Sequence, residues 1–205
     1  MPTRAVLAAL IFASSAMLAR QPAGLLQAPN VRQPVIVAFE TELGAIDIEV
    51  DAVHAPVTAA NFLKYVDAGL YDGGRFRRTV RPDNQTGKPV PIAVIQATAN
   101  PDRRGDYFPP IPLERTSVTG LSHKDGTLSM ARSGPDTATN EFSICVGDQP
   151  ELDFGAKRNP DGQGFAAFGR VVRGMDVVKK IQMSPADGET LTPMIKILRV
   201  RRVSM

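Results

Sequence analysis

The sequence predicts an all-β domain with minor α content, a closed barrel of eight antiparallel strands accompanied by two helices. Eight short runs of β-like composition, broken by turn residues, lie between residues 35 and 200 of the 205-residue chain. Two segments have helical spacing instead, and the regular alternation of strand and helix that a doubly wound sheet requires is absent. An antiparallel sheet of this size loses its exposed edges most simply by closing, and eight strands leave an interior that side chains alone can fill. A binding site is therefore expected on the outside of the barrel.

The first 19 residues differ from the rest of the chain. Arg4 precedes an apolar run over residues 5–13, and small residues follow that run. This is the pattern of a cleavable secretory signal peptide, with cleavage after Ala16 or Ala19. An uncleaved membrane anchor is the alternative, but the run is shorter than the roughly 20 residues that a spanning helix needs. We expect an exported protein, periplasmic or secreted, with no membrane span after cleavage.

Composition limits the classes of protein that fit. Residues 20–34 read as a Pro- and Gln-rich linker, and residues 35–205 have the length of one domain with a buried core. The net charge of +3 comes from scattered Lys and Arg, which argues against the basic stripe of a nucleic-acid-binding protein. The single Cys145 cannot form an internal disulfide and is expected to be a small buried hydrophobe. We expect a monomer that binds no nucleic acid and no cofactor.

The elements follow in order from the spacing of apolar residues. Strands over residues 35–39 and 45–50 flank a turn and form a hairpin, and Ile46, Ile48 and Val50 predict one buried face for its second strand.

A helix is predicted over residues 56–67, because Pro56 suits an early helical position, Thr58 can contribute to the cap and Gly69 ends the pattern. The remaining strands are predicted at residues 75–81, 92–97, 127–131, 140–146, 166–172 and 192–200, with a polar loop over 82–91 and a second helix over 174–183.

Seven motifs occur in a fixed order along the domain. They are Phe76-Arg77-Arg78, Ile95-Gln96, the run 126–131, Gly134-Pro135, the run 140–144, Leu152-Asp153 and the run 168–171. In order and spacing they resemble the cyclophilins over residues 35–203, and residues 55–62 are similar to the family's first helix. The resemblance implies an eight-stranded antiparallel barrel capped by two helices. It also implies a peptidyl-prolyl cis-trans isomerase that rotates X-Pro bonds of proline-containing polypeptides and assists the folding of exported proteins. The alternative is a catalytically weak cyclophilin-like chaperone or peptide-binding module.

The resemblance also implies catalytic residues. Rotation about a peptide bond costs about 18–20 kcal/mol, and an enzyme lowers this barrier by binding the twisted bond better than the planar one. A guanidinium is a suitable donor to the twisted nitrogen because it is rigid and permanently charged. By resemblance Arg78 is this donor and Gln96 holds the substrate backbone. Taken without the resemblance, each would be a solvated residue on the outer face of a strand.

An apolar socket for the proline ring is expected beside that donor. By resemblance the substrate-binding residues are Val94, Met130, Ala131, Arg132, Phe142, Ser143, Leu152 and Phe165. Met130 and Phe142 can equally be ordinary barrel packing. The chain departs from the family's pattern where Ser143 and Ala93 replace aromatic residues, Glu151 an indole and Phe165 a histidine. We therefore expect weak activity and weak binding of cyclosporin-class inhibitors.

Three other patterns point elsewhere and are set aside. Residues 162–167 have the form of a dinucleotide fingerprint but precede a strand, whereas that fingerprint must open a helix. His54 and His123 lie far apart in the sequence without a cluster of Cys or carboxylates, so no metal site is expected. A Ser-His-Asp triad is formally available at His123, but no nucleophile elbow surrounds any serine, so hydrolase chemistry is not expected.

Overall fold

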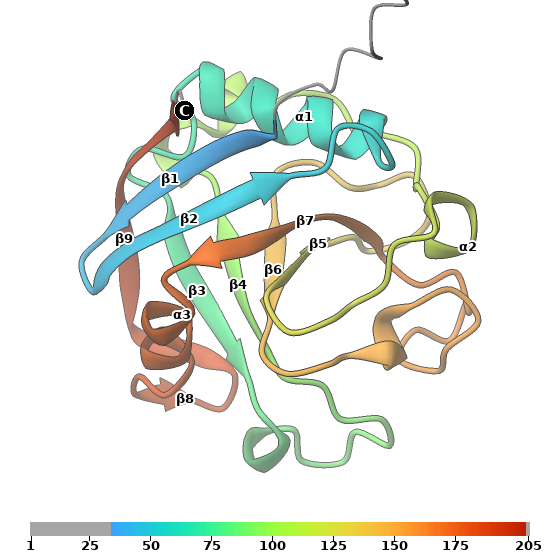
Figure 1. The fold of residues 1–205 in the computed structure, drawn as a ribbon. Coiled ribbons are helices and arrows are strands. Elements are labelled where there is room, and N and C mark those ends of the chain that lie inside the picture. Colours follow the sequence, from blue (N-terminus) through green and yellow to red (C-terminus); the bar gives the residue numbers. More distant parts are fainter. Residues whose placement is uncertain (1–33, 204–205) are drawn as a thin grey trace, which may run out of the picture. The chain divides into compact units, whose positions relative to one another are not determined.

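The computed structural model describes residues 34–203. The predicted signal peptide, residues 1–19, and nearly all of the predicted linker, residues 20–34, lie outside the described residues. The strands are β1 (Val35–Thr41), β2 (Gly44–Val50), β3 (Arg75–Val80), β4 (Val94–Thr98), β5 (Thr127–Met130), β6 (Phe142–Cys145), β7 (Ala166–Arg173), β8 (Ala186–Asp187) and β9 (Thr190–Val203) (Figure 1). The helices are α1 (Pro56–Asp67), α2 (Thr116–Thr119) and α3 (Met175–Gln182), with 3-10 turns at Pro82–Asn84, Pro101–Asp106 and Pro150–Leu152. Every predicted strand and helix is present within a few residues of its expected bounds, and α2 and β8 are additional.

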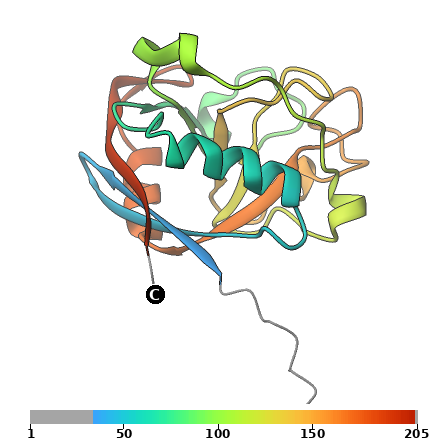
Figure 2. The same ribbon diagram turned by 90° about the horizontal axis from the view of Figure 1, so that it is seen from above.

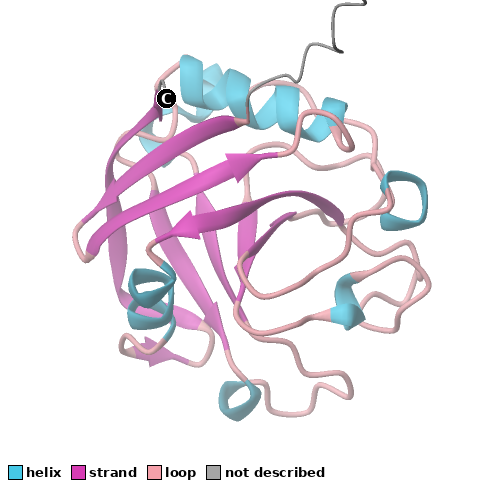
Figure 3. Cartoon of the chain, viewed as in Figure 1, coloured by secondary structure: helices cyan, strands magenta, loops and turns pink. Residues whose placement is uncertain are grey.

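The strands close into a barrel. Their order is β1-β2-β7-β5-β6-β4-β3-β9, and β9 pairs with β1 to complete the ring. Every pairing is antiparallel, and the short β8 pairs only with β9, outside the ring. Figure 3 shows the strands wrapping around one interior. The predicted fold, a closed eight-stranded antiparallel barrel, is confirmed.

Large side chains fill the interior of the barrel. Phe39, Phe62, Tyr71 and Phe142 are buried together, with ring centroids 5.4–6.2 Å apart in every pairing. Aromatic rings at these separations add to the free energy that burial of their area contributes. The filled interior argues against a small-molecule carrier, and it leaves the outer surface of the barrel for binding.

Two helices cover the barrel as predicted. α1 lies across one end, which the view from above in Figure 2 makes clear, and buries Phe62, Tyr65 and Val66. α3 buries Val178 and Ile181 in the same core. None of the helices within residues 34–203 has the length and apolar character needed to span a bilayer.

The cap of α1 differs from the prediction. Ala55 occupies the N-cap position without a side-chain cap, and the Thr58 hydroxyl is not the capping group. Instead the carboxylate of Glu114 accepts hydrogen bonds from the backbone N–H groups of Val57 at 3.0 Å and Thr58 at 2.7 Å. A carboxylate at this end of a helix also interacts favourably with the helix dipole. The expected cap at Thr58 was therefore wrong, because a distant residue supplies the acceptor.

Candidate active site on the outer face of the barrel

Four polar side chains lie in a row across neighbouring strands. Arg78 on β3 pairs with Gln96 on β4, Gln96 with Ser143 on β6, and Ser143 with Ser129 on β5. A β-bulge at Arg77 lets two consecutive arginines approach the outer face of β3. The register of the sheet therefore brings both predicted catalytic residues together.

An apolar row runs parallel to the polar one. Val80, Val94 and Cys145 are buried in a small cluster outside the main core, with Ile92, Leu152 and Phe165 packed over them. Successive residues in a strand point to opposite faces, so Val94 and Gln96 share the outer face of β4. A hydrogen-bond donor and an apolar notch thus lie side by side.

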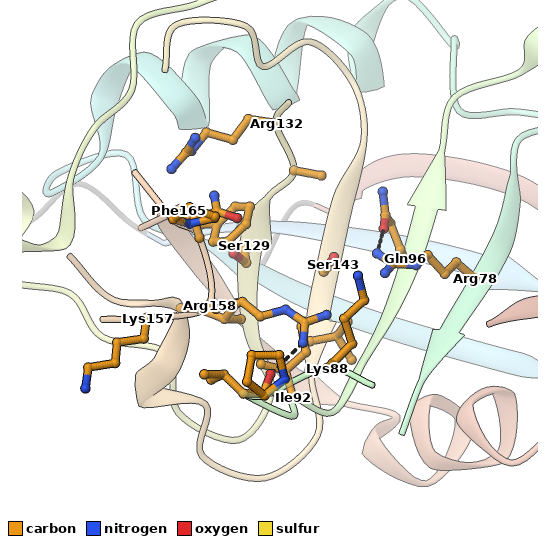
Figure 4. Close-up of a pocket in the computed structure, with 17 residues that line it drawn as sticks. Arg78, Lys88, Ile92, Gln96, Ser129, Arg132, Ser143, Lys157, Arg158 and Phe165 are labelled. Carbon is orange, nitrogen blue, oxygen red and sulfur yellow. Dashed lines mark hydrogen bonds between the residues drawn. The ribbon is translucent and has the colours of Figure 1, made fainter. Parts of the chain in front are cut away.

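Between these rows lies a cavity of about 510 Å³ (Figure 4). Eight of the predicted site residues line it: Arg78, Gln96, Val94, Ala131, Arg132, Ser143, Leu152 and Phe165. The other two, Met130 and Phe142, belong to the main core and face the interior. Because strand residues alternate between faces, Met130 cannot share the outer face with Ser129, nor Phe142 with Ser143. The barrel-packing alternative therefore describes Met130 and Phe142, which support the site from beneath.

The Arg78 guanidinium is held by two partners. Its Nε donates to Oε2 of Glu189 over 2.8 Å, its Nη2 donates to the same oxygen, and its Nη1 donates to Oε1 of Gln96 over 3.0 Å. A guanidinium carries five N–H donors. Those three bonds leave one N–H on each terminal nitrogen for a ligand. The side chain is 31% exposed, so the group is both fixed and accessible.

Gln96 links Arg78 to a second carboxylate. Its Nε2 donates to Oε2 of Glu141 over 2.6 Å, and Nη2 of Arg77 donates to the same oxygen over 2.6 Å. Gln96 is 6% exposed. Its amide therefore has a defined orientation, set at one end by Arg78 and at the other by Glu141.

Arg132 closes another side of the cavity. Its guanidinium donates to both carboxylate oxygens of Asp161, at 2.7 and 3.0 Å, and to the carbonyl oxygen of Gly164. It also lies over the ring of Phe165, 5.1 Å from the centroid. The hydrogen bonds from Arg132 and from the backbone of Gln163 lower the pKa of Asp161 to about 2. Arg132 is thus fixed as part of the wall, with most of its donors in use.

A series of hydrogen-bonded side chains, Asp153, His123 and Ser129, lies under the cavity. Nε2 of His123 lies 2.9 Å from the Ser129 hydroxyl, and Nδ1 of His123 lies 2.7 Å from the Asp153 carboxylate. The structure thus assembles the three residue types of a hydrolytic triad, although no such site was expected. Ser129 is only 3% exposed and sits in a regular strand, not on the sharp turn of a nucleophile elbow. We interpret these hydrogen bonds as structural: they hold β5 against the loop that carries Leu152.

Several residues of the site have no counterpart among the predicted ones. Glu189 and Glu141, which hold Arg78 and Gln96, were not expected there. The loop over residues 153–164 also walls the cavity and contacts the predicted loop over 82–91, since Nη1 of Arg158 donates to Gln85 Oε1 and to the carbonyl oxygen of Val90. Glu141 lies within the motif over residues 140–144, so its position in the sequence could have indicated that it belongs to the site. No pattern in the sequence pairs Glu189 with Arg78, 111 residues away.

Within residues 34–203, no group of three or more His, Cys, Asp or Glu side chains is arranged to hold a metal ion.

Comparison with known proteins agrees with this geometry. The family model described as cyclophilin type peptidyl-prolyl cis-trans isomerase/CLD matches residues 36–202. A peptidyl-prolyl cis-trans isomerase of Acinetobacter baylyi is 36% identical over 163 residues, which cover 79% of each chain. Peptidyl-prolyl cis-trans isomerase B of Escherichia coli is 35% identical over 149 residues, 72% of this chain and 84% of that one.

The fold has a solved counterpart. The crystal structure of a cyclophilin type peptidyl-prolyl cis-trans isomerase from Cryptosporidium parvum superposes with a TM-score of 0.66 at 20% identity, and covers 84% of this chain and 99% of that one. That likeness establishes the barrel, and the family model covers the strands that carry the outer site. The chain therefore belongs to the cyclophilin-type peptidyl-prolyl cis-trans isomerases.

Proposed function

We propose that this isomerase rotates X-Pro bonds held over the cavity between the polar and the apolar row. The observation that carries the proposal is the fixed Arg78 guanidinium, with two N–H groups free of the bonds to Glu189 and Gln96, beside the notch of Leu152 and Phe165. The proline ring lies in the notch. One free N–H of Arg78 donates to the imide nitrogen, which becomes a hydrogen-bond acceptor only when the bond is twisted.

This arrangement favours the transition state over the planar ground state. A planar amide nitrogen has no lone pair to offer, because that pair is delocalised into the carbonyl. The interaction with Arg78 therefore develops only as the bond twists, and such an interaction accelerates the reaction. Gln96 keeps the guanidinium in place, and the remaining N–H of its amide can donate to a substrate carbonyl. No bond is broken, so the reaction needs no nucleophile.

The test is a cis-to-trans conversion assay on a proline tetrapeptide. Arg78→Ala should reduce kcat/KM by about tenfold to a hundredfold, since a charged hydrogen bond is worth about 1.5–3 kcal/mol and each 1.36 kcal/mol is tenfold in rate. Arg170→Ala, the same change at an exposed position of β7, is the matched control and should match the wild type. Equal acceleration by wild type and Arg78→Ala would reject Arg78 as the donor. Peptide binding without acceleration by the wild type would favour the alternative, a peptide-binding module.

We further propose that the protein assists the folding of exported proteins as a monomer. The support is the pattern of Arg4 followed by the apolar run 5–13 and small residues, which is typical of a cleaved signal peptide. The expected result is a mature N-terminus after Ala16 or Ala19, determined by mass spectrometry of the protein from the extracytoplasmic fraction, and a monomeric mass in light scattering. A full-length protein recovered from the cytoplasm would contradict export.

A further inference from the structure

The cavity of the proposed site is lined by cations and by no carboxylate. Among residues 34–203, the charged side chains that line it are Arg78, Lys88, Arg132, Lys157 and Arg158. Arg78 and Arg132 form ion pairs with Glu189 and Asp161. Lys88, Lys157 and Arg158 form no ion pair within the part of the chain that the structure describes.

Two of these unpaired cations face the cavity. In Figure 4 the ammonium group of Lys88 and the guanidinium of Arg158 extend toward the space beside Ser143, on the side where Arg78 and Gln96 lie, whereas Lys157 points away. We call Lys88 and Arg158 the basic rim. They come from the two loops over residues 82–91 and 153–164.

Neither cation of the basic rim has a carboxylate as an ion-pair or hydrogen-bond partner among residues 34–203. Arg158 donates to neutral oxygens, the side-chain carbonyl of Gln85 at 2.8 Å and the backbone carbonyl of Val90 at 2.6 Å. Burial and the nearby positive charge of Arg78 lower the pKa of Arg158, while Glu189 acts in the opposite sense. Because an Arg side chain stays charged in any case, an anion entering the cavity would relieve this repulsion.

The cavity has room for more than a proline ring. Its volume of about 510 Å³ lies within the roughly 300–1,000 Å³ of pockets that hold whole drug-sized ligands. The small Ser143 leaves the floor open next to the basic rim, where the family's pattern has an aromatic residue. A side chain flanking the proline can therefore occupy the same cavity.

A second cavity continues the groove on the other side of Arg78. Arg78, Gln96, Ala131 and Arg132 line both cavities, and the second one, of about 660 Å³, is also lined by Arg77, which is paired with Glu141, and by Arg104. Both ends of the groove contain cations, but only the second contains a carboxylate and only the first contains the basic rim. A peptide whose proline lies beside Arg78 would place only one of its flanks against the basic rim.

We propose that the basic rim selects substrates with an acidic side chain, Asp or Glu, on one flank of the proline. This inference rests on the proposed function and adds the class of X-Pro sequence that the site prefers. The attraction acts on binding and on the rate of encounter, so it raises kcat/KM for acidic peptides. The preference for acidic peptides should depend on Lys88 and on salt, which distinguishes this preference from the catalytic role of Arg78.

The experiment compares acetylated tetrapeptides with Glu, Gln or Lys on either side of the proline, in an isomerisation assay that uses no coupling protease. On one flank, Glu should exceed Gln in kcat/KM by about threefold to fivefold, the range of a partly exposed ion pair, and Lys should fall below Gln. The preference should disappear at about 1 M NaCl, where charges are screened within about 3 Å. Lys88→Gln should lower the Glu-to-Gln ratio, and Arg158 should retain part of the preference.

Lys179→Gln is the matched control, because it removes the same charge from an exposed position of α3, and Lys179 lines neither cavity. It should keep the wild-type ratio. A wild-type ratio of one on both flanks, or equal ratios in Lys88→Gln and Lys179→Gln, would overturn the proposed selectivity. If the Gln peptide is accelerated without any preference for Glu, only the selectivity fails; if no peptide is accelerated, the proposed catalytic role fails with it.

Discussion

Removing the carboxylate of Glu189 should weaken catalysis, although Glu189 itself lines neither cavity. Of the three hydrogen bonds that hold the Arg78 guanidinium, Glu189 accepts two and Gln96 accepts one. In Glu189→Ala the long Arg78 side chain regains rotamer freedom, which must be lost again when the transition state forms. Ordering an Arg side chain costs about 1.5–2 kcal/mol, and Gln96 retains part of that order. We expect kcat/KM to fall by about fivefold to tenfold, since 1.36 kcal/mol corresponds to tenfold.

The opposing effect is smaller. Glu189 partly neutralises Arg78, so its removal makes the guanidinium a slightly stronger donor. The acceptor in the twisted bond is a neutral nitrogen, however, and a neutral acceptor gains less from added charge than from correct placement of the donor. The loss of order should therefore dominate.

A double-mutant cycle tests whether Glu189 acts by positioning Arg78 or independently of Arg78. If Glu189 acts only through Arg78, adding Glu189→Ala to Arg78→Ala should cause no further loss of kcat/KM, so the two effects are not additive. The assay is the same tetrapeptide conversion, with thermal unfolding as the check on folding. Unchanged or faster catalysis in Glu189→Ala, or full additivity in the double variant, would refute the reasoning.

Three further predictions concern the residues around the site. Phe142→Ala should lower the free energy of unfolding in urea by about 3–5 kcal/mol, because Phe142 is fully buried against three aromatic rings, whereas Leu198→Ala at an exposed position should have little effect. The Asp161 carboxyl should titrate by NMR with a midpoint near its folded pKa of about 2. That value lies below the ordinary 3.8, so the stabilisation from the pair with Arg132 is fully present above the ordinary pKa. The stabilisation is lost as the pH falls through about 2. A midpoint near the ordinary value would contradict the ion pair. Burial raises the pKa of the Cys145 thiol, so at about pH 8 a thiol reagent should modify the unfolded chain and leave the native protein unmodified.

The sequence predicted the barrel well because its signals are local. Apolar residues at every second position identify strands, and Pro56 and Gly69 mark the ends of a helix region. Closure then follows from the cost of exposed edges. Thr58 failed as a cap because Glu114, which caps the helix instead, is distant in sequence and has no local signature.

The site could be predicted only in part. The resemblance placed Arg78 and Gln96 correctly on one surface, but it grouped Met130 with Ala131 and Phe142 with Ser143, although neighbouring strand residues face opposite sides. Because side chains alternate between the two faces of a strand, Met130 beside Ala131 and Phe142 beside Ser143 belong to the core. The contacts of Glu189 depend on sheet register, and the basic rim depends on how two loops fold, so neither was accessible from the sequence.

The charged residues of the site divide into two sets with different physical tasks. Arg77, Arg78 and Arg132 each pair with a carboxylate, which fixes their geometry and limits their long-range field. Lys88 and Arg158 have no such partner among residues 34–203, so their field extends into the cavity. A donor that must meet a twisted nitrogen needs position more than charge, whereas a group that attracts an acidic side chain needs charge more than position. Salt should therefore separate the two tasks: turnover of a neutral X-Pro peptide should change little with ionic strength, while the preference for an acidic one should decline steadily.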